Sequence, residues 1–157
     1  KLQQPDIILN SKEASVGSAS SRTMRTESTL KGIPTITVEY GNPQVFQDDI
    51  IHRGFKGVMN TLRWLNMYGN IELQKLEDKA IYCKKSYWIY MEEGGFLEVT
   101  VALNQKLVKG ENIATVRNAF GEIIKEYIAP ENGIVIGKSS NPANMSGGRI
   151  IHLGIIE

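Results

Sequence analysis

Hydrophobic residues follow two different periods along the chain, and the change of period predicts two parts. Between residues 44 and 67 the apolar positions recur at three- and four-residue steps, which predicts an amphipathic helix that could be interrupted near Gly54 and Gly57. After residue 80 the apolar runs are short and are separated by turn-forming residues, as is typical of an all-β domain. The strands predicted there span residues 81–91, 96–101, 113–116, 123–128, 134–136 and 150–153.

A run of β-branched residues over 33–38 predicts a buried strand before the helix. Glu39 then lies at the carboxyl end of this strand, where open α/β sheets place their functional side chains. A surface glutamate leaving a strand would give the same local pattern. Residues 5–9 predict another short strand, and residues 10–28, rich in Ser, Thr and Gly, predict a loop. Strand, glutamate, turn and helix together indicate an α/β fold.

The composition is that of an ordinary globular protein and argues against several classes of partner. Of the 157 residues, 41% are hydrophobic and 22% are charged. A formal net charge of +1 gives no reason to expect nucleic acid or an anionic membrane as a partner. No apolar run has the length of a transmembrane helix. Cys83 is the only cysteine, so an internal disulfide is impossible and a cytoplasmic location is expected.

Residues 25–65 resemble the succinylglutamate desuccinylase/aspartoacylase family, and residues 94–154 resemble the C-terminal β domain of that family. The motifs that carry the first resemblance are Thr23–Arg25, Gly32–Pro34, Val38–Gly41, Gly54, Gly57–Val58, Asn60 and Leu62. These proteins are zinc-dependent amide hydrolases with a zinc carboxypeptidase-like fold. The resemblance therefore implies that residues 1–72 form the C-terminal part of an α/β catalytic domain. It implies that residues 73–157 form a small all-β barrel-sandwich domain.

The resemblance also implies roles for two side chains. It assigns Glu39 the general acid/base role in hydrolysis of the amide bond of an N-acyl amino acid, such as succinylglutamate or acetylaspartate. It assigns Arg25 to the substrate carboxylate, because a guanidinium group can bind a carboxylate through two parallel hydrogen bonds. A solvated or helix-capping arginine is the alternative for Arg25.

Zinc is implied as the cofactor of the complete protein, but the sequence lacks a recognisable set of zinc ligands. Catalytic zinc needs about three protein ligands, usually His, Glu or Asp. Neither His52 nor His152 has a partner at ligand spacing, so structural or surface roles are expected for both. No metal-binding residue is predicted in this chain. The family's His-x-x-Glu pair is expected before residue 1, which would leave this chain inactive alone; a natural relative without metal is the alternative.

The β half also resembles biotinyl/lipoyl carrier domains, in Val108–Glu111 and Ala129–Gly133. Carriers place the modified lysine at a hairpin tip, whereas the tip here, Asn118–Gly121, contains no lysine. A carrier-like fold without the carrier function is therefore predicted, and a non-catalytic binding or assembly module is the alternative function. Strands missing from the α/β sheet would leave an apolar face uncovered, which would favour a homo-oligomer.

Overall fold

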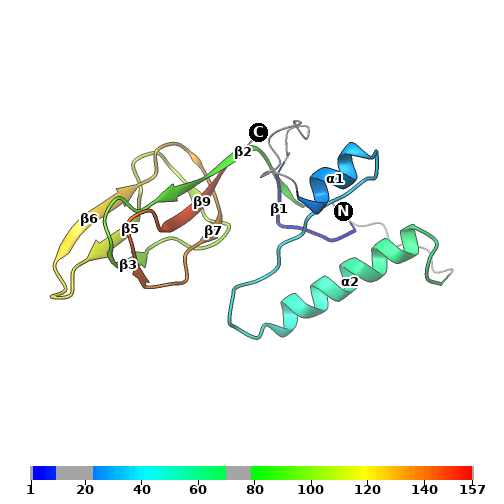
Figure 1. The fold of residues 1–157 in the computed structure, drawn as a ribbon, viewed down its shortest axis with the longest axis horizontal. Helices are drawn as coiled ribbons and strands as arrows, with labels where there is room; N and C mark the ends of the chain where they lie inside the picture. The colour runs from blue at the N-terminus through cyan, green and yellow to red at the C-terminus, as the bar shows by residue number, and fades with distance from the viewer. Residues whose placement is uncertain (1, 10–22, 70–78, 157) are drawn as a thin grey trace. The chain divides into compact units, whose positions relative to one another are not determined.

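The computed structural model describes residues 2–9, 23–69 and 79–156 (Figure 1). The chain divides into two compact units: the first contains Lys1–Pro5 and Ser11–Ala80, and the second contains Asp6–Asn10 and Ile81–Glu157. The predicted domain boundary between residues 72 and 73 lies outside the described residues and stays a prediction.

Two open β-sheets build the second unit. The five-stranded sheet has the order β1-β2-β9-β7-β4, and the four-stranded sheet has the order β6-β5-β3-β8. The strands are β1 (Ile7–Leu9), β2 (Ile81–Tyr90), β3 (Gly95–Val99), β4 (Lys106–Leu107), β5 (Asn112–Arg117), β6 (Ile123–Ile128), β7 (Gly133–Lys138), β8 (Ala143–Asn144) and β9 (Arg149–Ile156). Neither sheet closes on itself among the described strands, so the expected barrel-sandwich is not established.

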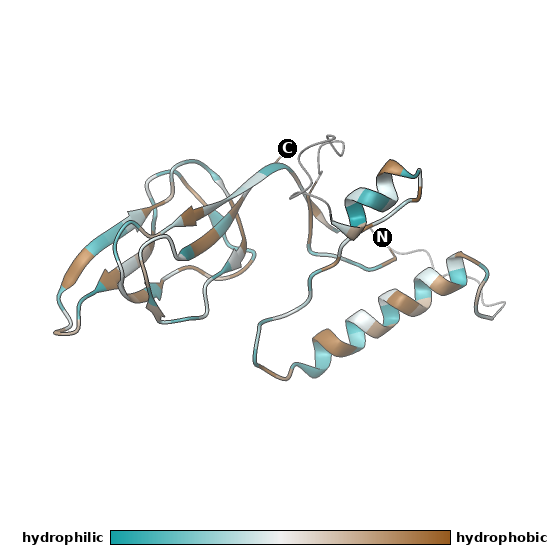
Figure 2. Cartoon of the chain, in the orientation of Figure 1, coloured by the Kyte–Doolittle hydropathy of each residue, from teal (hydrophilic) through white to brown (hydrophobic). Residues whose placement is uncertain are grey.

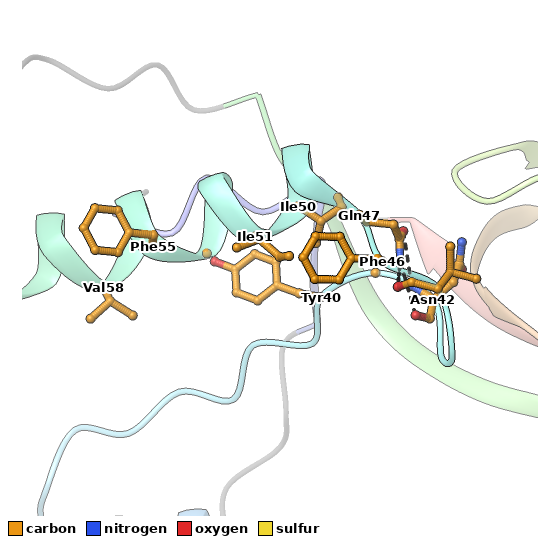
Figure 3. Close-up of a pocket in the computed structure, with 11 residues that line it drawn as sticks. Tyr40, Asn42, Phe46, Gln47, Ile50, Ile51, Phe55 and Val58 are labelled. Carbon is orange, nitrogen blue, oxygen red and sulfur yellow. Dashed lines mark hydrogen bonds between the residues drawn. The ribbon is translucent and has the colours of Figure 1, made fainter.

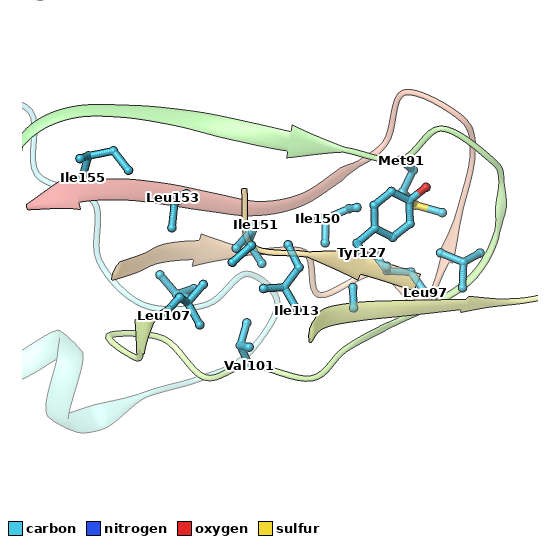
Figure 4. Packing of buried hydrophobic residues seen from close by; sticks show 14 residues of the cluster. Met91, Leu97, Val101, Leu107, Ile113, Tyr127, Ile150, Ile151, Leu153 and Ile155 are labelled. Atoms are coloured by element: carbon cyan, nitrogen blue, oxygen red, sulfur yellow. The ribbon is translucent and has the colours of Figure 1, made fainter. Parts of the chain in front are cut away.

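Apolar side chains from both sheets form one core in the second unit (Figure 4). The four-stranded sheet contributes Leu97 and Val116, and the five-stranded sheet contributes Val135 and Leu153. Val116, Val135 and Leu153 are each 0% exposed. Such complete burial of branched aliphatic side chains is the main source of stability available to a unit of this size.

The predicted strands after residue 80 are confirmed, and the prediction of residues 123–128 matches β6 at both ends. The short strands β4 and β8 were not predicted, because two residues are too few to show an alternating pattern. β1 confirms the strand expected near residues 5–9. It pairs in parallel with β2, with Ile7 opposite Ile81, and so belongs to the β unit.

A polar contact fastens the turn before β7 to β2. The hydroxyl of Tyr87 donates to Oε1 of Glu131 at 2.8 Å, and the ammonium of Lys85 donates to the same oxygen at 3.2 Å. Burial, followed by the bond to Glu131, raises the pKa of Tyr87 to about 12. The hydrogen bond from Tyr87, followed by that from Lys85, lowers the pKa of Glu131.

Two helices characterise the first unit: α1 (Met24–Leu30) and α2 (Asp48–Trp64). The amphipathic helix expected over 44–67 is therefore confirmed. It is not interrupted at Gly54 and Gly57. α1 falls at the end of the stretch predicted to be a loop, most of which lies outside the described residues.

Thr23 explains why the serine- and threonine-rich stretch becomes helical. Its Oγ1 accepts a hydrogen bond from the backbone N–H of Thr26 at 3.1 Å, which caps the first turn of α1. At the other end Gly32 adopts φ +72°, and the N–H of Ile33 bonds the carbonyl of Ser28 at 2.9 Å. This is the usual way in which a left-handed glycine closes a helix.

The buried strand expected over residues 33–38 is wrong for this structure. The segment 33–40 has no regular secondary structure, and Ile36 is 70% exposed. No hydrogen bond joins the backbone of Thr35–Glu39 to another residue in the described ranges. A β-strand is stabilised by its neighbours, and no strand of the first unit is available beside this segment among the described residues.

Candidate functional site

Tyr40, the residue after Glu39, is fixed against one face of α2. A Cβ atom added at Gly54 would lie 3.6 Å from the nearest ring carbon of Tyr40. A Cβ atom added at Gly57 would lie 3.1 Å from the hydroxyl oxygen of Tyr40. Gly57 is the one buried residue of α2. The two glycines lie three residues apart and so share a face of the helix, which lets the aromatic ring approach the backbone closely.

A chain of hydrogen bonds locks this contact. The hydroxyl of Tyr40 donates to Oε1 of Gln3 at 3.0 Å, and Nε2 of Gln3 donates to Oγ1 of Thr61 at 2.8 Å. The hydroxyl of Thr61 in turn donates to the carbonyl oxygen of Gly57 at 2.9 Å. The segment that carries Glu39 is thereby tied to α2 through residues distant in sequence.

Further bonds hold the N-terminal segment along α2. Nδ2 of Asn60 donates to the carbonyl oxygen of Leu2 at 3.2 Å, and Nε of Arg53 donates to that of Gln4 at 3.2 Å. With Gln3 clamped between these two contacts, the partner of Tyr40 has a fixed position. α2 therefore organises the first unit.

Gln47 shapes the turn between Tyr40 and α2. Its Nε2 donates to the carbonyl oxygens of Asn42 at 3.2 Å and Val45 at 3.3 Å, and its Oε1 accepts from the N–H of Asn42 at 3.4 Å. Gly41 permits the reversal because it adopts φ +68°. The side chain of Gln47 thus replaces backbone bonds that the turn cannot make for itself.

An open groove of about 460 Å³ lies between this turn and the first turns of α2 (Figure 3). Its lining is mostly apolar, and several lining side chains are largely exposed, among them Phe46 at 83% and Phe55 at 65%. The lining residues are Tyr40, Gly41, Asn42, Val45, Phe46, Gln47, Ile50, Ile51, Gly54, Phe55 and Val58. The groove can accommodate apolar groups and offers polar contacts only at Tyr40 and in the Asn42–Gln47 turn.

The two candidate site residues lie in the first unit. Glu39 is exposed and directly precedes the anchored Tyr40, at the end of the segment 33–40. Arg25 is exposed and lies in the first turn of α1, next to the Thr23 cap. α1 ends at the tight turn at Gly32, from which the segment bearing Glu39 starts.

Among the described residues, neither histidine lies in a group of possible metal ligands. Nδ1 of His52 lies 2.7 Å from the carbonyl oxygen of Asp48, one turn earlier in α2. His152, in β9, stacks on Trp88 with ring centroids 4.9 Å apart, and its Nε2 lies 2.9 Å from Oγ of Ser86. In the parts of the chain that the structure describes, no three residues among His, Cys, Asp and Glu are placed to hold a metal ion.

Sequence reasoning missed the contact between Tyr40, the residue after Glu39, and Gln3. A signal for Tyr40 was present, since two glycines three residues apart on an otherwise regular helix indicate close approach of another group. No local pattern could have identified Gln3, which lies 37 residues from its partner.

Comparison with solved structures places the fold. EutE (DoeB), an ectoine utilization protein from Ruegeria pomeroyi, matches 99% of this chain with a TM-score of 0.80 and 21% identity, over 48% of its own length. A succinylglutamate desuccinylase from a Silicibacter species matches 89% of the chain with a TM-score of 0.74 and 21% identity, over 44% of its own length. A succinylglutamate desuccinylase/aspartoacylase from Rhodobacter sphaeroides matches 86% with a TM-score of 0.69 and 14% identity, over 44% of its own length.

The sequence itself gives no such match. No protein-family model matches it, and a search of curated proteins found no match. Among the described residues, no helix combines the length and the apolar character needed to cross a membrane.

The solved structures show that the chain has the fold of part of the succinylglutamate desuccinylase/aspartoacylase structures. It spans about half the length of the solved chains it matches.

Proposed function

We propose that this chain is part of a zinc-dependent deacylase that hydrolyses the amide bond of an N-acyl amino acid, such as succinylglutamate or acetylaspartate. Two independent observations support the proposal. The sequence carries the motifs around Glu39 that resemble this family, and the fold is shared over 89% of the chain with a succinylglutamate desuccinylase. A cytoplasmic location belongs to the same proposal, because Cys83 is the only cysteine of the sequence and an internal disulfide is therefore impossible.

The proposed chemistry divides between two side chains. Glu39 takes a proton from the attacking water and delivers it to the leaving amine, which is the usual task of a general acid/base in amide hydrolysis. Arg25 binds the carboxylate of the amino-acid part and so orients the scissile bond. The observation that carries the assignment is the anchoring of Tyr40 on α2, since it fixes the backbone next to Glu39.

The described residues do not fit a zinc site, because no three potential ligands come together in them. The proposal therefore requires zinc ligands from outside these residues. When bound, the metal would lower the pKa of the attacking water. A natural relative without metal is the competing hypothesis, and the zinc content of the complete protein separates the two.

Substitution of Glu39 by Gln in the complete protein tests the assignment. The variant keeps the size and hydrogen-bonding shape of the side chain but cannot move a proton. Turnover of succinylglutamate or acetylaspartate, followed as release of the free amino acid, should fall by about 10²- to 10⁴-fold. Glu93→Gln, at an exposed turn of the second unit, is the matched control and should leave turnover unchanged. Equal turnover of Glu39→Gln and the parent protein would remove Glu39 from the mechanism.

We also propose that the second unit is a carrier-like β domain used structurally. The tip between β5 and β6 is a tight turn in which Oδ1 of Asn118 accepts from the N–H groups of Phe120 and Glu122 at 2.9 and 3.0 Å. It offers no lysine for biotinyl or lipoyl attachment. Treatment with a biotin or lipoate ligase should therefore leave the mass of the protein unchanged.

A further inference from the structure

A stack of aromatic and cationic side chains lies on the face of the five-stranded sheet that points away from the core. Tyr87 and Ile89 of β2 pack against the core, so Ser86 and Trp88, which alternate with them, point to the opposite face. The register of β2 and β9 places Trp88 directly opposite His152. The rings stack with centroids 4.9 Å apart and an interplanar angle of 13°.

The third strand of this group, β7, leaves room for the indole ring. Gly137 is paired with His152, and a Cβ at Gly137 would lie 3.5 Å from an outer carbon of the Trp88 ring. The ring of Trp88 therefore extends from β2 across β9 toward β7, which holds it in one orientation.

Arg149 lies over this fixed ring. The central carbon of its guanidinium group is 4.7 Å from the centroid of the Trp88 ring. Stacking on an aromatic ring orients a guanidinium group and leaves the N–H donors at its edges available for other partners.

The other arginine of the second unit provides the contrast. Nε of Arg117 lies 4.0 Å from a carboxylate oxygen of Glu98, and its Nη1 donates to the carbonyl oxygen of Gly121 at 3.1 Å. Arg149 is exposed, and no described residue makes a hydrogen bond or an ion pair with its guanidinium group. Arg149 is thus oriented by an aromatic ring while its donors lack an acceptor within the described ranges.

We propose that Arg149, held on Trp88, binds the carboxylate of a small organic acid at the outer face of the five-stranded sheet. A planar guanidinium edge matches a carboxylate with two parallel hydrogen bonds. The inference rests on the second unit alone and stands whether or not the deacylase proposal holds.

The fluorescence of Trp88 can report ligand binding, because the chain contains only one other tryptophan, Trp64. In a Trp64→Phe background, titration with succinate should change the fluorescence of Trp88 to saturation. Arg149→Ala should weaken succinate binding at least tenfold, and Arg149→Lys should do so by a smaller factor, since an ammonium group keeps the charge but loses the fork. Circular dichroism verifies that both variants stay folded.

Arg117→Ala is the matched control, since it removes the same charge from the same unit and should leave succinate binding unchanged. Inorganic phosphate is the second probe, and a response to phosphate equal to that of succinate would overturn the choice of a carboxylate. The absence of a saturable change with succinate would overturn the site. An identical response in Arg149→Ala would overturn the role of Arg149. An NMR titration of the Arg149 Nε–H signal supplies a readout that does not depend on Trp88.

Discussion

The two units of the chain differ in how far they bury their apolar residues. In the second unit, Ile113, Ile151 and Leu153 are each 0% exposed and belong to one core. In the first unit, Gly57 is the only buried residue in the described ranges, whereas Ile36 is 70% exposed and Phe55 65% exposed. Figure 2 shows the hydrophobic bands that run along α2. The second unit buries a core of its own, although apolar side chains such as Phe120 and Val108 stay exposed. The first unit has no such core among the described residues, and its apolar pattern is one made for contacts that these residues do not supply.

This contrast predicts very different costs for equal truncations. Leu153→Ala removes a fully buried side chain and leaves a cavity, so the free energy of unfolding should fall by about 2–5 kcal/mol. Phe55→Ala removes a side chain that is already mostly in water, and the loss should stay below about 1 kcal/mol. Urea unfolding followed by circular dichroism measures both. Equal costs would mean that Phe55 is buried in solution, and the contrast between the units would fail.

The glycines of α2 sharpen the description of the first unit. Gly54→Ala should stabilise it by about 1 kcal/mol, because alanine favours a helix and its Cβ meets Tyr40 at an ordinary contact distance. Gly57→Ala gains the same propensity, but its Cβ would overlap Oε1 of Gln3 and break the hydrogen bonds to Tyr40 and Thr61. Its net effect should therefore be less favourable than that of Gly54→Ala by about 1–3 kcal/mol. The loss of helical circular dichroism follows the unfolding of this unit, since both described helices belong to it. Equal stabilisation by both variants would contradict the Tyr40–Gln3 contact.

The smallest expected effect on stability comes from the hydrogen bond between Tyr87 and Glu131 in the second unit. Tyr87→Phe removes the hydrogen bond to Glu131 and should reduce the free energy of unfolding by about 1 kcal/mol. Tyr90→Phe, at an exposed position of the same strand, should have no measurable effect.

The stabilisation by this hydrogen bond should depend on pH. Because the folded-state pKa of Tyr87, about 12, lies above its ordinary value of 10.0, the stabilisation is complete below pH 10 and disappears as the pH rises toward 12. For Glu131 the pKa is lowered, so its contribution is present above pH 4.5 and is lost as the pH falls below that value. Parallel pH profiles of Tyr87→Phe and the parent protein would show that the bond does not form.

The strands of the second unit could be predicted well from the sequence because short apolar runs separated by turn-forming residues recur along it. β6, whose predicted bounds match the structure at both ends, is the clearest strand, and α2 of the first unit is the clearest helix, since its apolar residues recur at three- and four-residue steps. The segment 33–38 shows the limit of the same reasoning. Its β-branched residues favour a strand, but a strand forms only beside a partner, and composition cannot show whether a partner is present.

The candidate site was predictable only in part. Glu39 and Arg25 came from a resemblance, and the structure places both in the first unit without testing their roles. The hydrogen bond that anchors the residue after Glu39 joins Tyr40 to Gln3, and such long-range contacts leave no local signal. The stack of Arg149, Trp88 and His152 likewise depends on the register of β2 and β9, which includes a bulge between Ile89 and Tyr90.

Native-state hydrogen exchange tests the contrast between the units most directly. The amides of Thr35–Glu39 have no backbone partner among the described residues, so they should exchange at nearly the rate of an unfolded peptide. The amides of Ile150–Ile155 lie within β9, between β2 and β7, and should exchange only through global opening of the second unit. Slow exchange across Thr35–Glu39, comparable to that of β9, would show that this segment is paired in solution and would contradict the account.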